Sequence, residues 1–197
     1  MKYALMIRND ALSKETALKI KEGLKDFFMY DDQNPDLVIS IGGDGTILEA
    51  VHHYLNKDCC FVGIHTGTLG FYTDYQVDQV DQFIKDVTSR EFTTMKRYLL
   101  EIKVNKKNQS ETYYALNELR LDQGLQAQVI HVYINDVLFE VFRGNGLCVS
   151  TPSGSTAYNK SLGGAIIYPG IPLMQMTEVA GIHHNAVSYT HLTLPTK

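Results

Sequence analysis

The segment Gly42-Gly43-Asp44-Gly45-Thr46 combines glycines, which suit a phosphate-binding loop, with one acidic group. It directly follows residues 37–41, an apolar run typical of a buried β-strand. Glycines at the end of such a strand let the backbone approach a phosphate, and the N-terminus of a following helix favours anions. The Asp44 carboxylate could then orient a hydroxyl or accept its proton during phosphoryl transfer. A plain turn with Asp44 as a helix cap is equally open, and without a Walker lysine this is not a standard P-loop.

A second loop is predicted at residues 65–71, after the next apolar run. Phe71 or Tyr72 could stack on a base, although ordinary packing is the more common role of a single aromatic residue. His65 is expected to be structural. His52 and His53 have no carboxylate or cysteine partner at a fitting spacing, so we assign no metal ligands.

Two further segments carry polar groups. Leu116-Asn117-Glu118 ends a β-rich run, and its amide and carboxylate suit a ribose diol or an adenine edge, although its spacing alone favours an exposed turn. Arg143-Gly144-Asn145-Gly146 precedes residues 150–161, a run of hydroxyl and small residues that could present backbone N–H groups to a polar ligand. The simpler alternative is a Ser/Thr-rich surface loop. No Gly-x-Ser-x-Gly elbow is present, which disfavours a serine hydrolase.

Strands and helices alternate in the first half of the chain. Ser13 resembles a helix N-cap, with apolar residues at helical spacing from Ala17 to Phe28. A short helix is expected through Leu55, and an amphipathic helix over residues 77–87. Buried strands are expected at residues 2–7, 37–41 and 60–64. This alternation predicts an α/β domain with a parallel sheet.

Short β runs replace this pattern near residues 92–97, where we place a domain boundary. Expected strands are residues 100–104, 112–116, 129–134 and 137–142, and Asn135-Asp136 is a plausible hairpin turn. A helix could start at Thr156. We therefore predict an α/β nucleotide-binding domain over 1–95, a β-rich domain over 96–182, and a non-native tail over 183–197, where periodicity is lost.

The composition is that of a soluble globular protein. Hydrophobic residues make up 44% and charged residues 20%, and the formal net charge is −4, which gives little support to nucleic-acid binding. No apolar run reaches membrane-spanning length, and the N-terminus is too short for a signal peptide. Cys59, Cys60 and Cys148 have neither zinc-ligand spacing nor a disulfide framework, so we expect buried thiols in the cytoplasm.

Together these segments resemble the bacterial NAD kinase family over residues 1–182. The Gly42–Thr46 motif alone is shared with diacylglycerol and sphingosine kinases and is similar to one in 6-phosphofructokinases. Its combination with Leu116-Asn117-Glu118, Arg143-Gly144 and residues 150–158, in the order and approximate spacing of the family, is much more specific. Gly163-Gly164 and Thr177-Glu178-Val179-Ala180 extend the match.

The resemblance implies a fold, a reaction and a set of site residues. The fold is an N-terminal α/β domain with a Rossmann-like parallel sheet, followed by a mostly-β, sandwich-like domain that is incomplete here. The reaction moves the ATP γ-phosphoryl group to the adenosine ribose 2′-hydroxyl of NAD, giving NADP and ADP, with Asp44 as general base. The implied NAD-contacting residues are Asp44, Gly45, Phe71, Asn117, Glu118, Arg143, Asn145, Thr156, Ala157, Tyr158, Ser161 and Ala180.

The resemblance also implies a divalent metal such as Mg²⁺ and a homo-oligomer, a dimer or tetramer, in which a neighbouring subunit completes the NAD site. Asn145 stands where the family commonly has Asp, which removes a negative charge, and Thr68 stands where many relatives have His. Family members also continue beyond residue 182 with more β structure. Two alternatives therefore stay open: a lipid kinase of the diacylglycerol type, which would also use Asp44, and a nucleotide-binding fragment without turnover.

Overall fold

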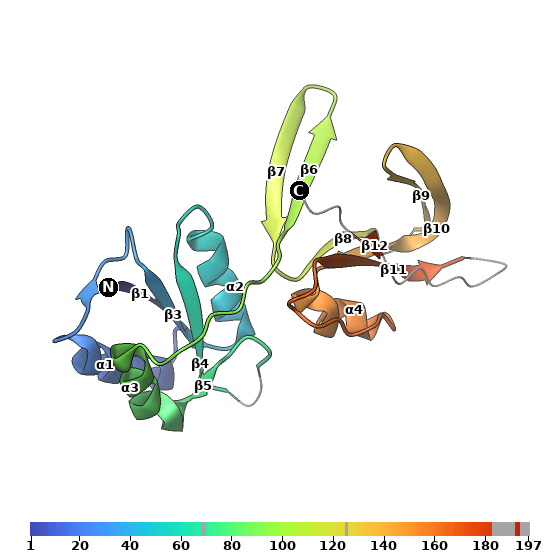
Figure 1. The fold of residues 1–197 in the computed structure, drawn as a ribbon. Helices are drawn as coiled ribbons and strands as arrows, with labels where there is room; N and C mark the ends of the chain where they lie inside the picture. Colours follow the sequence, from blue (N-terminus) through green and yellow to red (C-terminus); the bar gives the residue numbers. More distant parts are fainter. Residues whose placement is uncertain (68–69, 125, 183–191, 194–197) are drawn as a thin grey trace. The chain divides into compact units, whose positions relative to one another are not determined.

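The computed structural model describes residues 1–67, 70–124, 126–182 and 192–193. By its internal contacts the chain divides into two compact units, Met1–Thr94 and Met95–Lys197. The first contains a sheet with helices, and the second consists mostly of strands (Figure 1). This arrangement confirms the expected fold class, an α/β domain followed by a mostly-β domain.

The first unit is built on a five-stranded parallel sheet with the strand order β2-β1-β3-β4-β5. The strands are β1 (Lys2–Ile7), β2 (Met29–Tyr30), β3 (Leu37–Gly42), β4 (Cys60–His65) and β5 (Tyr75–Gln76). Every residue of β3 is buried, Ser40 included, as a run rich in apolar residues predicts for a central strand covered on both faces.

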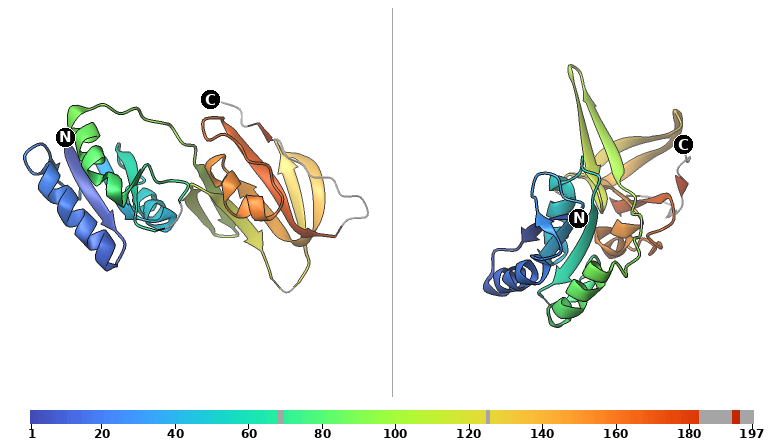
Figure 2. Two further views of the ribbon diagram at one scale, coloured as in Figure 1. Left: turned by 90° about the horizontal axis from the view of Figure 1, so that it is seen from below. Right: turned by 60° about the vertical axis from the view of Figure 1, so that its left-hand side comes forward.

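Helices cover both faces of this sheet (Figure 2). They are α1 (Ala11–Leu24), α2 (Asp44–His53) and α3 (Val80–Ser89), the last preceded by the 3₁₀ turn η1 (Val77–Gln79). Ile20 of α1 and Phe83 of α3 pack against Ile39 on one face. On the other face Ala50 and Tyr54, from α2 and its C-terminal end, pack against Val38. Alternate residues of β3 therefore contribute to two separate cores.

Four predicted details of this unit are wrong. The helix expected to extend through Leu55, α2, ends at His53. The N-cap of α1 is Asp10, whose backbone is extended and whose Oδ1 accepts the N–H of Ser13 at 2.9 Å, while Ser13 itself is buried inside the helix. The helix also ends at Leu24 and does not reach Phe28. Cys60, expected to be buried, is exposed. Cys60 is the first residue of β4, and the core on its face of the sheet includes Val62 and Ile64 further along the strand but not Cys60.

The second unit contains one larger antiparallel sheet, ordered β12-β11-β10-β8, with β9 also paired to β10. Its strands are β8 (Glu118–Asp122), β9 (Gln128–Ile134), β10 (Val137–Ser150), β11 (Leu173–Gly181) and β12 (Leu192–Thr193). A separate hairpin is formed by β6 (Leu100–Lys106) and β7 (Gln109–Ala115), which Figure 2 also shows. The 3₁₀ turn η2 (Ser153–Thr156) and the short helix α4 (Tyr158–Ser161) follow β10.

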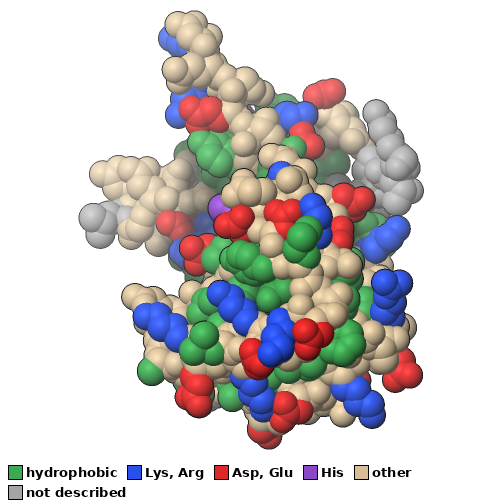
Figure 3. Space-filling view, turned by 90° about the vertical axis from the view of Figure 1, so that its left-hand side faces the viewer, with side chains coloured by type: hydrophobic (Ala, Val, Ile, Leu, Met, Phe, Trp, Pro, Cys, Tyr) green, Lys and Arg blue, Asp and Glu red, His purple; other side chains and the backbone are tan. Residues whose placement is uncertain are grey.

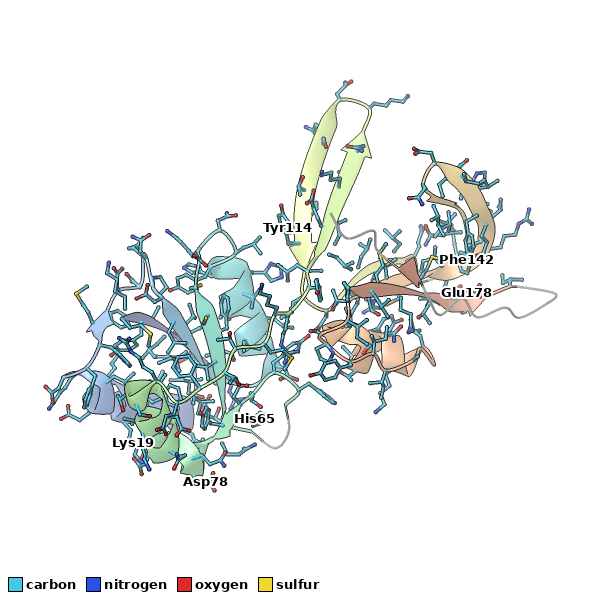
Figure 4. All side chains as sticks on the ribbon, viewed as in Figure 1. Lys19, His65, Asp78, Tyr114, Phe142 and Glu178 are labelled. Atoms are coloured by element: carbon cyan, nitrogen blue, oxygen red, sulfur yellow. The ribbon has the colours of Figure 1, made fainter. Side chains whose placement is uncertain are left out.

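The predicted hairpin turn is confirmed. Asn135 and Asp136, between β9 and β10, have φ angles of 50° and 63°. Two successive left-handed residues are what a tight hairpin turn requires, and Asn and Asp tolerate that conformation. Beyond the turn, Phe142 is fully buried and forms a core with Leu147 and Met176 (Phe142 is labelled in Figure 4).

On the face of the molecule in Figure 3, Lys and Arg side chains lie interspersed with Asp and Glu side chains, and hydrophobic side chains lie between them. Within the described part of the chain, no helix combines the length and the apolar character that crossing a membrane demands.

Two expectations concern residues that lie outside the described part of the chain and therefore remain untested. They are the expectation about Thr68 and the expectation about the tail, residues 183–197, of which only β12 is described.

Candidate functional site

Three parallel strands of the first unit end side by side. Ile7 at the end of β1 pairs with Ile41, and Gly42 at the end of β3 pairs with His65 at the end of β4. The segments that follow these strands therefore meet at one edge of the sheet, where ligands of open α/β sheets bind. Figure 4 shows His65 at this edge.

Asp44 is the first residue of α2 and lies at this edge. The Phe71 N–H contacts both of its carboxylate oxygens at 3.0 Å, and the Tyr72 N–H donates to Oδ1 at 3.0 Å. Asp44 is thus not the helix cap, because Gly43 holds that position without a side-chain bond. The carboxylate instead joins the end of β3 to the loop that follows β4.

The glycines around Asp44 have different roles. A Cβ at Gly42 would lie 2.1 Å from Oγ1 of Thr46, so this position has no room for a side chain. A Cβ at Gly43 or Gly45 would meet no atom within 4 Å. Close protein packing therefore requires Gly42 but not Gly43 or Gly45. The space at these two positions is free for a ligand to approach the backbone.

His65 supports the second loop, as the structural interpretation predicts. Its side chain is only 2% exposed, and its Nδ1 accepts the Gly67 N–H at 2.8 Å. Among the described residues its Nε2 has no hydrogen-bond partner. A Cβ at Gly70 would lie 2.6 Å from the His65 ring and 2.9 Å from Oδ1 of Asp44. Gly70 therefore lies closely between the histidine and the carboxylate.

The two aromatic candidates of this loop differ in exposure. Tyr72 is buried, whereas the Phe71 side chain is 55% exposed. Only Phe71 therefore offers a ring to a ligand.

In the second unit, Asn117 and the segment after β10 are in direct contact. The Thr151 N–H donates to the Asn117 carbonyl at 2.8 Å. A Cβ at Gly154 would lie 2.0 Å from that same carbonyl oxygen, so only glycine fits there. The Thr151 hydroxyl donates to the Leu116 carbonyl and accepts the Gly154 N–H. Two motifs that are far apart in the sequence thus form one polar structure.

Asn159 fixes the following turn to the sheet, a role that no sequence pattern indicates. Its side chain is fully buried, and its Nδ2 donates to the carbonyls of Ser155 and Ala165 at 3.2 Å each. Its Oδ1 accepts the Thr177 hydroxyl of β11 at 2.6 Å. Its neighbours Thr156, Ala157 and Tyr158 are half-buried, and Ser161 is exposed.

Glu118 and Arg120 lie on one face of β8, opposite Ser150 and Cys148 of β10. Burial raises the pKa of Glu118, and the positive charge of Arg120 opposes this shift. Among the described residues the Glu118 Oε2 is buried without a hydrogen-bond partner. The Arg120 guanidinium lies 3.8 Å from the centre of the Tyr158 ring and also bonds Asp122 at 2.8 Å. One face of the Tyr158 ring is thus covered by a cation.

Arg143, Asn145 and Ala180 gather where β10 pairs with the end of β11. The Arg143 carbonyl accepts the Ile182 N–H at 2.7 Å, and Gly144 pairs with Gly181. Ala180 has a φ of 47°, a left-handed conformation that costs an alanine about 1–2 kcal/mol. Such strain often accompanies binding sites. The Thr156–Ser161 segment contacts β11 elsewhere, at Thr177, which pairs with Cys148.

No cluster of three or more His, Cys, Asp and Glu side chains in the described ranges has the geometry to hold a metal ion. Of the site residues expected from the sequence, Asp44, Gly45 and Phe71 belong to the first unit and the others to the second.

Each of the two units matches a family model, and both models describe domains of the same family. The family model of the ATP-NAD kinase N-terminal domain matches residues 6–92, and that of the ATP-NAD kinase C-terminal domain matches residues 116–186. NAD kinase 1 of Bacillus anthracis is 45% identical over 189 residues, which cover 93% of this chain and 71% of the relative.

Solved structures show the same fold at low sequence identity. Yeast NADH kinase in complex with NADH superimposes with a TM-score of 0.85 and 22% identity, over 99% of this chain and 69% of the yeast chain. An NAD kinase from Archaeoglobus fulgidus in complex with ATP gives a TM-score of 0.79 and 23% identity, over 98% of this chain and 77% of the other.

Proposed function

We infer the roles of individual residues from the finding that this chain belongs to the ATP-NAD kinase family and is an NAD kinase. These comparisons decide against the lipid kinase alternative. The reaction phosphorylates NAD to NADP, and we propose ATP, which the Archaeoglobus fulgidus relative binds, as the phosphoryl donor. The observation that carries the assignment of the reacting group is the Asp44 carboxylate, fixed by the Phe71 and Tyr72 N–H groups beside two open glycines.

We propose that Asp44 is the general base. Its two oxygens offer about four lone-pair sites, so the N–H contacts of the loop leave room for a substrate hydroxyl. As the NAD 2′-oxygen bonds to the γ-phosphorus, the bond from this phosphorus to the β–γ bridging oxygen breaks, and Asp44 takes the hydroxyl proton. The ADP formed carries away the electron pair of the broken bond. The rest of catalysis is positioning and charge stabilisation.

We propose that both units contribute to NAD binding. In the first, Gly45 allows close backbone approach, and the exposed Phe71 ring offers a stacking surface. In the second, the Asn117 amide and the Glu118 carboxylate suit a ribose diol. The burial of Glu118 supports this role, because a carboxylate held away from water without full hydrogen bonding is commonly found where a ligand binds. The remaining proposed contacts are Arg143, Asn145, Thr156, Ala157, Tyr158, Ser161 and Ala180.

We propose that a divalent metal, Mg²⁺ in the simplest case, enters as part of the MgATP substrate. Mg²⁺ retains several waters and is usually bound by substrate phosphates with one or two carboxylates. Its chemistry is to neutralise the negative charge that develops on the phosphate oxygens. At the edge of the first unit Asp44 is the carboxylate closest to the open glycines, and Asp10 is already bonded to Arg8 and Ser13.

We also propose a homo-oligomer in the cytoplasm. Exposed apolar side chains on the β9–β10 hairpin, including Val129, Tyr133 and Val141, give a surface that a second copy could cover. Cys59, Cys60 and Cys148 are free thiols, which is the state that a reducing compartment maintains.

The test is NADP formation from NAD and MgATP, read with an NADP-specific dehydrogenase, beside a parallel assay with diacylglycerol in mixed micelles. We expect NADP to form and the lipid to stay unphosphorylated. Phosphorylation of the lipid alone would contradict the proposal. NAD binding by calorimetry without NADP formation would instead identify a nucleotide-binding chain without turnover.

A further inference from the structure

Arg8 is a cation at the edge where Asp44 lies, and the sequence motifs did not point to it. It directly follows β1, and its N–H donates to the Ile41 carbonyl at 2.9 Å, so it lies beside the end of β3. A Cβ at Gly42 would be 3.0 Å from the Arg8 Cβ. The base of the Arg8 side chain therefore borders the Gly42–Thr46 loop.

The Arg8 guanidinium is held in place from two sides. Its Nε donates to Oδ2 of Asp10 at 2.6 Å, and its Nη2 lies 3.5 Å from the Thr66 carbonyl after β4. Asp10 is itself fixed, because it accepts the N–H of Ser13 at 2.9 Å and the hydroxyl of Ser13 at 2.7 Å. The Ser13 hydroxyl also contacts the Thr66 hydroxyl at 2.8 Å, in the protein interior. This network spans the ends of β1 and β4.

The guanidinium still has donors to offer. Arginine carries five N–H groups, and within the described ranges only the Nε and Nη2 contacts have protein acceptors. The side chain is 46% exposed, so the remaining donors can be reached by a ligand. Hydrogen bonds from Arg8 and Ser13 hold the pKa of Asp10 well below its usual range, so Asp10 stays anionic and keeps Arg8 oriented.

The charge requirement of the reaction singles out this residue. A triphosphate carries several negative charges, and phosphoryl transfer depends on their neutralisation. The segments that follow β1, β3 and β4 at this edge are residues 8–10, 43 and 66–74, and their sequence contains no Lys or Arg other than Arg8. The Gly42–Thr46 loop also has no following lysine of the Walker type.

We propose that Arg8 binds the phosphate chain of the nucleoside triphosphate donor, with Asp10 and the Thr66 carbonyl orienting its guanidinium. The proposal rests on the proposed function, in which ATP is the donor at this edge. A planar guanidinium can bond two phosphate oxygens at once, whereas an ammonium acts as a point charge. The geometry of Arg8 and not only its charge is therefore expected to matter.

The first experiment compares Arg8→Gln and Arg8→Lys with the control Lys14→Gln, which removes an exposed cation from α1. We expect Arg8→Gln to raise the KM for ATP about 10- to 100-fold, since a bond between charged groups is lost, with the KM for NAD changed less than about twofold. Arg8→Lys should lie between the wild type and Arg8→Gln, and Lys14→Gln should match the wild type. An unchanged KM for ATP, or equal rises for ATP and NAD, would overturn the proposal.

The second experiment is independent of turnover and uses inorganic tripolyphosphate as the probe. Calorimetric binding should be detected for the wild type and for Lys14→Gln, and should weaken about tenfold or more for Arg8→Gln. A wild type that makes no NADP but shows this pattern would count against the proposed function and still support the role of Arg8. Equal binding by the wild type and Arg8→Gln, or no binding by either, would refute that role.

Discussion

The Asp44 carboxylate accepts the N–H groups of Phe71 and Tyr72 at 3.0 Å. The Glu118 carboxylate has a different environment, because its Oε2 is buried and has no hydrogen-bond partner among the described residues. The first arrangement fixes a charged group at a sheet edge. The second leaves a charged group in an environment that opposes its charge, and a ligand hydroxyl at Oε2 would relieve this. Both features are those of residues kept for binding and chemistry rather than for stability.

Glu118 gives a prediction about the pH dependence of stability. Burial raises its pKa above the ordinary value of 4.5, so its contribution to stability is present below pH 4.5 and is lost as the pH rises through the higher, folded-state pKa. Glu118→Gln mimics the protonated acid. We therefore expect this variant to melt at a higher temperature than the wild type at pH 7.5 and at nearly the same temperature at pH 4, while it binds NAD more weakly.

Thermal unfolding at the two pH values, beside calorimetric binding of NAD, checks this prediction. Asp58→Asn, at an exposed position of the first unit, is the control for the loss of one carboxylate charge. A variant that is less stable than the wild type at pH 7.5, or a stability difference that does not vary with pH, would show that burial does not oppose the Glu118 charge.

Among the elements, the loop after β4 depends on His65. Its Nδ1 accepts the Gly67 N–H, and further along the same loop the Phe71 and Tyr72 N–H groups hold Asp44. His65→Asn places an amide oxygen close to the Nδ1 position and can still accept this N–H, whereas His65→Leu cannot. We expect His65→Leu to lower kcat at least about tenfold, because small displacements of reacting groups are costly. His65→Asn should retain most of the activity, and the KM for NAD should change little in either variant.

Steady-state kinetics of the two variants, with their melting temperatures as a check on folding, decide this point. Equal losses of kcat in His65→Asn and His65→Leu would mean that the Gly67 bond does not position Asp44.

Three of the five strands of the first unit, β1, β3 and β4, follow from the sequence, because a run rich in apolar residues is typical of a strand covered on both faces. The two-residue strands β2 and β5 do not, because runs this short carry no periodicity. The ends of the elements follow less well. Asp10 and Ser13 are both good capping residues, and the extended backbone at Asp10 decides between them. Cys60 has the apolar surroundings of a buried residue in the sequence, yet it is exposed because the core on its face of the sheet begins further along β4, at Val62 and Ile64. Periodicity carries no information about that.

At the scale of the whole chain, the candidate site could be predicted only as separate motifs. The Asn117 carbonyl leaves no room for a side chain at Gly154, and nothing in the spacing of these two residues in the sequence indicates this contact. Asn159 has the sequence surroundings of an ordinary polar loop residue, although its buried amide joins three segments. Arg8 stands alone after a strand and matches no motif. Contacts between distant segments create these roles, and a local pattern cannot show them.

The most direct test of the role of Asp44 is the kcat of the Asp44→Asn variant for NADP formation, measured together with the Kd of this variant for NAD. Asn keeps the size of the side chain and one acceptor oxygen but cannot take up a proton near neutral pH. We expect kcat to fall about 10²–10⁴-fold, the usual contribution of a general base, with the Kd for NAD within about threefold of the wild type. Asp58→Asn, at an exposed position of the same unit, should be unaffected. Turnover by Asp44→Asn close to that of the wild type would contradict the assignment of Asp44 as the general base.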